Sequence, residues 1–201
     1  KEMTVEEVMK EIQKDKVFYR YGGGVTLSGG EPLLQWEFAL ELLKQCKKEG
    51  IHTAIETSLY VKQEVLREVL PYLDRIFADF KLENEEFHKK YTGVSNEKIR
   101  DNLRFLLESE KKDAVIIRTP MIPGMTAAKE NVEAIGRFLS RIYPDVSYEI
   151  LNYNPLAEAK YHLIDREYCF EENPKLYPKE QMEQFSSWAQ KGGVRHVIIE
   201  S

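Results

Sequence analysis

Hydrophobic residues recur along the chain in two alternating patterns. Short apolar or β-branched runs predict strands at residues 25–27, 52–55, 75–80, 114–118, 146–151 and 194–199. Between them, apolar residues at helical spacing predict amphipathic helices, for example from Phe38 to Cys46 and from Met182 to Trp188. The predicted order is a helix, then repeated strand–helix units, and then a last strand.

Polar residues predict where several helices begin or end. Thr4 and Glu7 have the spacing of a capping box before the first helix. Ser95 and Thr126 stand where two later helices are expected to begin. Gly50 follows the second helix in the place of a C-terminal glycine. These signals support the alternation of helices and strands independently of hydrophobicity.

Strands separated by helices of about a dozen residues pair in parallel through right-handed crossovers. Two architectures have that order, an open doubly wound sheet and a (β/α) barrel. A complete (β/α)8 barrel takes about 250 residues, so the 201 residues of this chain hold about six units. We therefore expect an α/β fold, a parallel sheet of the partial, TIM-like (β/α)6 barrel type, in a single domain over residues 1–201.

Composition and charge narrow the class of protein. Hydrophobic residues make up 42% and charged residues 31%, which is typical of a globular domain. The net charge of −5 argues against a nucleic-acid partner. No apolar run approaches the ~20 residues of a membrane span, and no targeting signal is visible, so we expect a cytoplasmic protein without membrane contact. The chain begins at Lys1, directly before a helix, and we expect it to be a fragment of a longer chain.

Cysteine and histidine exclude several kinds of metal site. The two cysteines, Cys46 and Cys169, can neither form a disulfide scaffold nor hold a cysteine-rich cluster by themselves. Cys46 lies on an apolar helix face, where a buried free thiol is the ordinary explanation. The four histidines lack the spacing of a zinc motif. We expect neither a metal ligand nor a catalytic residue within this chain.

Polar residues follow five predicted strands in succession, where binding sites of parallel α/β folds lie. These strand ends are residues 28–32, 56–58, 79–81, 118–119 and 152–154. Each polar residue alone has an ordinary alternative, as a helix cap, a surface ion-pair partner or a turn former. Because all five ends carry a charged or amide side chain, we predict a ligand site at this edge of the sheet.

The glycine-rich segment around the first strand fits neither common phosphate-binding motif. Leu27 stands in place of the third glycine of G-x-G-x-x-G. Gly30 and Glu31 stand where a P-loop needs Lys and Ser or Thr. Gly29 and Gly30 instead either allow a ligand to approach the backbone closely or form a structural turn.

The segment G-G-G-V-T-L-S-G-G-E-P-L-L-Q, residues 22–35, resembles the glycyl radical enzyme activating enzymes. These enzymes, of the pyruvate formate-lyase activating enzyme type, belong to the radical S-adenosylmethionine (SAM) superfamily. Further similar segments follow in order at residues 47–58, 78–81, 92–96, 116–124 and 151–157. The resemblance therefore covers nearly the whole chain.

The resemblance implies a partial barrel whose first strand is missing from this chain, with SAM and a [4Fe–4S] cluster as cofactors. The cluster motif C-x-x-x-C-x-x-C is absent from residues 1–201, so we expect it upstream of Lys1 and expect this fragment alone to be inactive. In the family, an electron cleaves the S–C5′ bond of SAM, and the resulting 5′-deoxyadenosyl radical takes a hydrogen from a glycine. The implied partners are a glycyl radical enzyme, such as formate C-acetyltransferase, and an electron donor such as flavodoxin or ferredoxin.

The resemblance also assigns a set of cofactor-binding residues at the strand ends: Gly29, Gly30, Glu31, Glu56, Thr57, Asp79, Lys81, Arg118, Asn152 and Asn154. The sequence departs from the family pattern at Glu56, Phe77 and Asn154, where the formate-lyase type has Asp, Met and His.

Several of these residues have individual roles implied by the resemblance. Gly29 to Glu31 resembles the segment that receives the amino group of SAM, for which backbone carbonyl groups suit an ammonium donor. Asp79 and Lys81 match a D-x-K pair that faces the cofactor. Glu56 and Thr57, together with Asp79, resemble a monovalent-cation site.

Two other functions remain open for the sequence. One is a radical SAM enzyme of similar architecture that acts on a small molecule. The other is a barrel remnant that binds a phosphate or nucleotide without radical chemistry.

Overall fold

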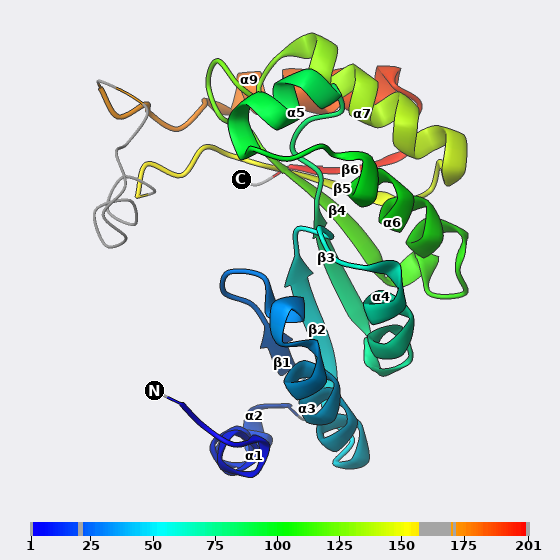
Figure 1. The fold of residues 1–201 in the computed structure, drawn as a ribbon. Coiled ribbons are helices and arrows are strands. Elements are labelled where there is room, and N and C mark those ends of the chain that lie inside the picture. The colour runs from blue at the N-terminus through cyan, green and yellow to red at the C-terminus, as the bar shows by residue number, and fades with distance from the viewer. Residues whose placement is uncertain (1, 20–21, 157–169, 171, 200–201) are drawn as a thin grey trace. The chain divides into compact units, whose positions relative to one another are not determined.

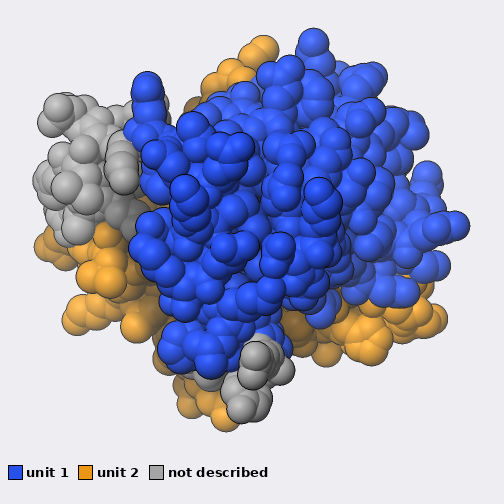
Figure 2. Space-filling model, turned by 90° about the horizontal axis from the view of Figure 1, so that it is seen from below, with its two compact units in different colours: residues 1–79, 95–116 blue, residues 80–94, 117–201 orange. Residues whose placement is uncertain are grey.

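Figure 1 shows the fold in a computed structural model, which describes residues 2–19, 22–156, 170 and 172–199. The chain divides into two compact units, coloured separately in Figure 2. Unit 1 comprises residues 1–79 and 95–116, and unit 2 comprises residues 80–94 and 117–201. Every helix in the described part of the chain is too short or too polar to cross a lipid bilayer. That residues 1–201 form a single domain stays a prediction.

Unit 1 contains three parallel-paired strands, with helices before, between and after them. Its strands are β1 (Gly24–Leu27), β2 (His52–Thr57) and β3 (Arg75–Asp79). Its α-helices are α1 (Val5–Lys14), α2 (Lys16–Tyr19), α3 (Trp36–Lys48), α4 (Gln63–Val69) and α6 (Glu97–Glu108). Short 3-10 turns are η1 (Pro32–Gln35), η2 (Leu70–Tyr72) and η3 (Lys112–Ala114).

Unit 2 contains one helix that precedes β4 in the chain, most of β4 itself, and the elements that follow it. Its strands are β4 (Val115–Pro120), which begins in unit 1, β5 (Ser147–Leu151) and β6 (His196–Ile199). Its described helices are α5 (Glu85–Thr92), α7 (Lys129–Ile142) and α9 (Lys179–Lys191).

The strands form one six-stranded sheet in the order β1-β2-β3-β4-β5-β6. The pairs β1–β2, β2–β3 and β5–β6 are parallel. Because each strand pairs with the next one along the chain, the order lacks the reversal that defines a doubly wound sheet. The open sheet is therefore of the partial TIM-like barrel type, as the sequence predicted.

The two faces of the sheet in unit 1 differ in burial. The parallel registers Leu27↔Ile55 and Ile55↔Ile76 place these three side chains on one face. Ile55 and Ile76 are buried, and Leu27 packs against an apolar cluster that includes Leu42 of α3. This face is the one that the helices cover, so the residues between these positions in each strand belong to the opposite face.

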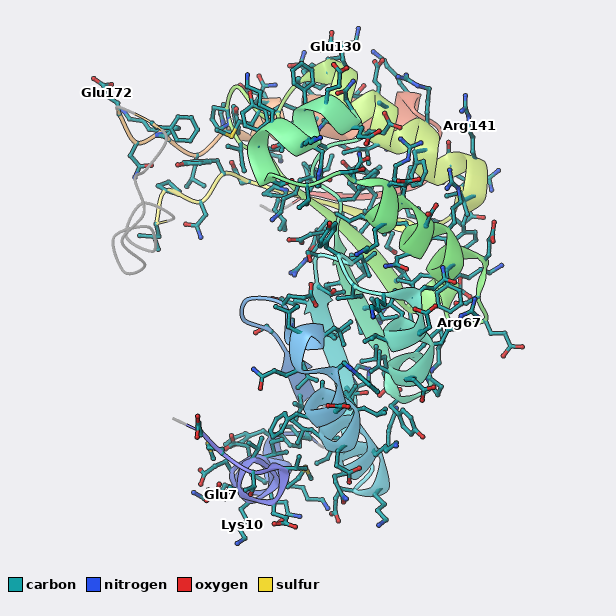
Figure 3. All side chains as sticks on the ribbon, viewed as in Figure 1. Glu7, Lys10, Arg67, Glu130, Arg141 and Glu172 are labelled. Carbon is teal, nitrogen blue, oxygen red and sulfur yellow. The ribbon has the colours of Figure 1, made fainter. Side chains whose placement is uncertain are left out.

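Helix α1 begins as the sequence predicted. The Thr4 hydroxyl accepts a hydrogen bond from the Glu7 amide (3.2 Å), and the Glu7 carboxylate accepts one from the Thr4 amide (2.8 Å). This is the reciprocal pattern of a capping box. Glu7 and Lys10 lie on the outer, exposed side of α1 (Figure 3).

The opposite side of α1 covers Cys46 of α3. Met9, Leu42, Cys46 and Ile51 form a buried cluster, in which the sulfur atoms of Cys46 and Met9 are 3.8 Å apart. Burial raises the pKa of the Cys46 thiol. Cys46 is therefore a structural thiol, as the sequence predicted, and Cys169 lies outside the described residues.

Two local features differ from the sequence pattern. The prediction that Thr126 begins a helix is wrong, because α7 begins at Lys129 and the Thr126 hydroxyl closes a turn with the backbone of Pro120 and Ile122. Helix α5 was not predicted, since His88 is its buried residue and its other positions give no apolar stripe.

Helices α7 and α9 of unit 2 lie side by side (Figure 1) and approach each other closely at two glycines. A Cβ atom placed on Gly136 would lie 2.6 Å from the carbonyl oxygen of Ala189 and 3.1 Å from the Cα atom of Gly192. Both neighbouring atoms belong to the backbone, which cannot move aside as a flexible side chain can. The packing of these helices therefore requires glycine at position 136.

We expect Gly136→Ala to lower the free energy of unfolding by about 1–3 kcal/mol, because the added methyl overpacks the contact. This range is the net loss, because the ~1 kcal/mol by which alanine favours a helix over glycine offsets part of a larger clash with two backbone atoms. Urea unfolding of both proteins measures the difference. Arg137→Ala, at the exposed neighbouring position, is the control and should change stability by about 0.5 kcal/mol or less. A Gly136→Ala protein as stable as the native one would contradict the close helix contact.

Candidate functional site

The loop after β1 brings two glycines to the carboxyl end of the strand. Gly29 has a φ of +123°, a conformation that residues with a side chain rarely adopt. A Cβ atom placed on Gly29 or Gly30 would meet no described atom within 4 Å, apart from the chain neighbours. The backbone of this loop is therefore accessible to a small molecule.

The carboxylate of Glu31 joins this loop to the end of β2. Its Oε1 atom accepts hydrogen bonds from the Leu33 amide (3.2 Å) and the Thr57 hydroxyl (2.9 Å). Its Oε2 atom accepts from the Ser58 amide (2.8 Å) and hydroxyl (2.6 Å), and lies 3.0 Å from the Thr57 hydroxyl. The bond from Leu33 also caps η1. One side chain thus binds donors from η1 and from the residues at the end of β2.

The turn after β2 is strained and is held from two sides. Leu59 is fully buried and has a φ of +58°, a left-handed conformation that costs a leucine about 1–2 kcal/mol. On one side, the Leu59 amide donates to the Thr57 hydroxyl (3.0 Å). On the other, the side-chain amide of Asn102 donates to the carbonyl oxygens of Leu59 (2.8 Å) and Val61 (2.9 Å). Such a conformation persists only where the surrounding contacts over-determine it.

Glu56 and Asp79 share one face of the sheet, and the Thr57 side chain points to the other. In register, Glu56 lies opposite Phe77, and Thr57 lies opposite Ala78. Because side chains alternate along a strand, Asp79 shares the face of Phe77 and Glu56. Glu56 and Asp79 are partly exposed, whereas Thr57 is buried (4% exposed). The structure therefore places two of the three side chains predicted for a cation site on one face, and separates the Thr57 hydroxyl from them.

In unit 2, Arg118 of β4 forms an ion pair with Glu149 of β5. The Nε atom of Arg118 donates to Oε2 of Glu149 at 2.7 Å, and the side chains are 21% and 23% exposed. Their strand neighbours Thr119 and Tyr148 are buried, so the pair occupies the less buried face of these strands. The sequence analysis missed Glu149 because it lies within a strand. A charged residue in the alternating segment S-Y-E-I-L was the available signal.

On the buried face of the same strands, two hydroxyl groups and a carbonyl oxygen are linked by hydrogen bonds. The Tyr148 hydroxyl donates to the Thr119 hydroxyl (2.9 Å), which donates to the carbonyl oxygen of Phe80 (2.6 Å). Burial strongly raises the pKa of Tyr148, so this phenol stays protonated. These two hydrogen bonds fix the segment that follows β3, just before Lys81.

Lys81 lies in a segment whose backbone is fixed by Asn131 of α7. The Asn131 amide donates to the carbonyl oxygens of Lys81 (3.0 Å) and Thr126 (3.0 Å) and accepts from the Glu83 amide (3.1 Å). Asn131 therefore shapes the loop that carries Lys81. No pattern in the sequence indicated this role, because a single asparagine on a helix matches no motif.

The two asparagines after β5 bind backbone groups. Asn152 Oδ1 accepts from the amides of Tyr153 (2.8 Å) and Tyr177 (2.9 Å), and its Nδ2 donates to the carbonyl oxygen of Tyr177 (2.9 Å). Asn154 Oδ1 accepts from the Leu156 amide (2.9 Å). Both side chains thus hold the backbone of the segments around them, and their contact with a cofactor stays a prediction.

The described residues provide no site for an iron–sulfur cluster. No group of three or more His, Cys, Asp or Glu side chains among them could hold a metal ion. Clusters of this kind need several cysteine thiolates. The chain has two cysteines, and Cys46 is buried in the core of unit 1. A cluster therefore does not fit residues 1–201 alone.

A double-mutant cycle measures the ion pair between Arg118 and Glu149. We expect Arg118→Ala, Glu149→Ala and the double variant to give a coupling free energy of about 1–3 kcal/mol, because both charges are partly desolvated. The control is the exposed pair Arg195–Asp145, with Nη1 and Oδ1 3.1 Å apart, which should couple by about 1 kcal/mol or less. Coupling no larger than in the control would contradict a distinct role of burial at this pair.

Comparison with known proteins assigns this chain to a family. Residues 1–138 match the radical SAM superfamily. The isethionate sulfite-lyase activating enzyme of Desulfovibrio desulfuricans is 42% identical over 168 residues, which are 83% of this chain and 54% of that protein. The (2S)-3-sulfopropanediol dehydratase activating enzyme of Klebsiella oxytoca is 46% identical over 171 residues, 84% of this chain and 53% of that protein. The chain thus spans about half the length of these curated relatives.

A solved structure agrees with this result. A domain of pyruvate-formate lyase-activating enzyme from Bacteroides vulgatus superposes with a TM-score of 0.70 at 27% identity, covering 90% of this chain and 100% of that domain. The resemblance that the sequence showed to activating enzymes is therefore confirmed. The matched region covers well over half of the chain, so this chain belongs to the radical SAM superfamily, whose members use SAM and a [4Fe–4S] cluster.

Proposed function

We propose that this chain is the barrel part of an activating enzyme that uses SAM and a [4Fe–4S] cluster to remove a hydrogen atom from a glycine of a partner enzyme. The observation that carries the proposal is the identity of 42% and 46% to two activating enzymes over more than four-fifths of the chain. The open sheet and the accessible glycine loop after β1 support it.

The proposed partner is a glycyl radical enzyme. The names of the relatives mention a sulfite-lyase, a dehydratase, an indoleacetate decarboxylase and a choline trimethylamine-lyase as the enzymes that they activate. Formate C-acetyltransferase, the partner expected from the sequence, is thus one candidate among several. We propose the class of partner and not one member of it.

SAM suits the chemistry of the described side chains in unit 1. Its ammonium group needs hydrogen-bond acceptors, and the exposed residues Gly29 and Gly30 carry backbone carbonyl groups of this kind. The carboxylates of Glu56 and Asp79 share the partly exposed face of the sheet, where they suit ribose hydroxyls or a monovalent cation.

The proposal includes the remaining residues assigned by the resemblance. These are Lys81, Arg118, Asn152 and Asn154, whose cationic and amide groups suit the carboxylate and adenosine of SAM. The Thr57 hydroxyl is bonded to Glu31, so the proposed cation site rests on the carboxylates of Glu56 and Asp79.

The cluster ligands are proposed to lie outside residues 1–201. Cluster and SAM together supply the radical chemistry, while the protein positions SAM and shields the reaction from solvent. On the family resemblance, we propose that the electron comes from a reductant such as flavodoxin or ferredoxin. We propose a cytoplasmic location on the same ground.

The direct test mixes the cluster-containing protein that carries this chain with SAM, a reductant and a purified glycyl radical enzyme under anaerobic conditions. We expect 5′-deoxyadenosine to form and a glycine-centred radical to appear in the electron paramagnetic resonance spectrum of the partner. The control partner carries alanine in place of the radical glycine and should give no such signal.

Two results would contradict the proposed function. Formation of 5′-deoxyadenosine without a protein radical, with each partner class tested, would favour a radical SAM enzyme that acts on a small molecule. Binding of SAM without any reductive cleavage would favour a nucleotide-binding protein without radical chemistry.

The 201-residue chain by itself should not hold a cluster, because its two cysteines cannot supply the ligands. Incubation with iron and sulfide should therefore leave no blue-violet charge-transfer absorption after gel filtration. A longer chain that includes a C-x-x-x-C-x-x-C segment is the control and should retain the absorption. A stable cluster on residues 1–201 would contradict the placement of the ligands outside this chain.

A further inference from the structure

The carboxylate of Glu31 has its acceptor positions filled by the protein. A carboxylate offers about four lone-pair positions on its two oxygens. The Leu33 amide, the Thr57 hydroxyl, and the amide and hydroxyl of Ser58 supply four donors at 2.6 to 3.2 Å. The Glu31 side chain is therefore engaged within the protein, although its backbone belongs to the loop proposed to receive SAM.

This carboxylate fixes a loop that packing cannot fix. Gly29 and Gly30 have no side chains, and Cβ atoms placed on them would meet no described atom within 4 Å apart from chain neighbours. The next residue, Glu31, is anchored to the end of β2 by three donors from Thr57 and Ser58. The position of the glycine backbone thus follows from the Glu31 bonds.

The anchor at the end of β2 is itself well determined. The hydroxyl groups that donate to the carboxylate also accept hydrogen bonds, Thr57 from the Leu59 amide (3.0 Å) and Ser58 from the Tyr60 amide (3.3 Å). Asn102 binds the carbonyl oxygen of Leu59 from the other side. Hydrogen bonds that are linked through the same hydroxyl group polarise one another, which strengthens the network.

We propose that Glu31 and Ser58 are positioning residues for SAM, which act through the backbone of Gly29 and Gly30 rather than by side-chain contact with the ligand. The inference rests on the proposed function, because it takes SAM as the ligand of this loop. It identifies Ser58 as a residue of the site that the sequence analysis did not assign.

The network requires a carboxylate, and glutamine cannot replace it. In one amide orientation the –NH2 group of a Glu31→Gln protein faces the amide N–H of Leu33, and in the other it faces that of Ser58. Neither backbone N–H can accept a hydrogen bond. Either orientation therefore replaces one backbone hydrogen bond with two facing N–H donors and removes the negative charge, while the size of the side chain stays the same.

The test measures SAM dissociation constants by equilibrium dialysis on the cluster-loaded protein, together with the melting temperature of each variant. We expect Glu31→Gln to raise the Kd about tenfold or more, as loss of charge-assisted bonds implies. Ser58→Ala should raise it about threefold, because one hydroxyl donor is lost. Ser58→Thr returns a hydroxyl and should restore the native Kd.

Asp74 provides a matched control at the opposite end of β2. Its Oδ2 atom accepts from the amide (2.9 Å) and hydroxyl (3.3 Å) of Thr53, as Glu31 does from Ser58, and it pairs with Lys47. We expect Asp74→Asn to lower the melting temperature and to leave the Kd for SAM unchanged.

The outcomes separate this inference from the proposed function. Equal Kd values for the native and Glu31→Gln proteins would overturn the positioning role, whatever happens to the melting temperature. Failure of the native protein to bind SAM would overturn the proposed function and this inference with it. If Glu31→Gln does not fold, Ser58→Ala and Ser58→Thr decide the question by the same comparison.

Discussion

The candidate site in unit 1 depends on hydrogen bonds between one carboxylate in the loop after β1 and the end of the neighbouring parallel strand, β2. The backbone ladder pairs these strands as far as Leu27 and Ile55, so the glycine loop after β1 needs a further connection to the end of β2. Glu31 supplies this connection through donors from Leu33, Thr57 and Ser58. An ionised acceptor makes stronger bonds than a neutral one, which lets a glycine loop without packed side chains keep a defined backbone.

Because side chains alternate along each strand, the apolar and the charged residues lie on opposite faces of the sheet. In unit 1, Ile55 and Ile76 lie on the helix-covered face, whereas Glu56 and Asp79 lie on the partly exposed one. Unit 2 repeats the pattern, with the Arg118–Glu149 ion pair on its less buried face. A family whose cofactor carries ammonium, carboxylate and sulfonium groups needs such a polar face, while the apolar face supplies the stability of the fold.

The sequence predicted the architecture and the strand ends well, because hydrophobic periodicity and strand order follow from short segments. It could not predict where individual side chains point. Thr57 stands beside Glu56 in the chain, yet alternation places the two on opposite faces. The task of Asn152, bound to the backbone of Tyr177, depends on a residue far along the chain. Helix α5 was not predicted, because its buried residue is a single histidine and the helix therefore has no apolar stripe.

Hydrogen exchange at the Ser58 backbone amide tests the central claim most directly, because this amide donates to Glu31 at 2.8 Å and lies beyond the last residue of β2. The measurement uses the native protein without ligand and follows the exchange of this one amide. We predict that Ser58 exchanges as slowly as the amides inside β2, since the carboxylate bond must break first. Exchange as fast as that of exposed loop amides would contradict the account, because the end of β2 would then not anchor the glycine loop.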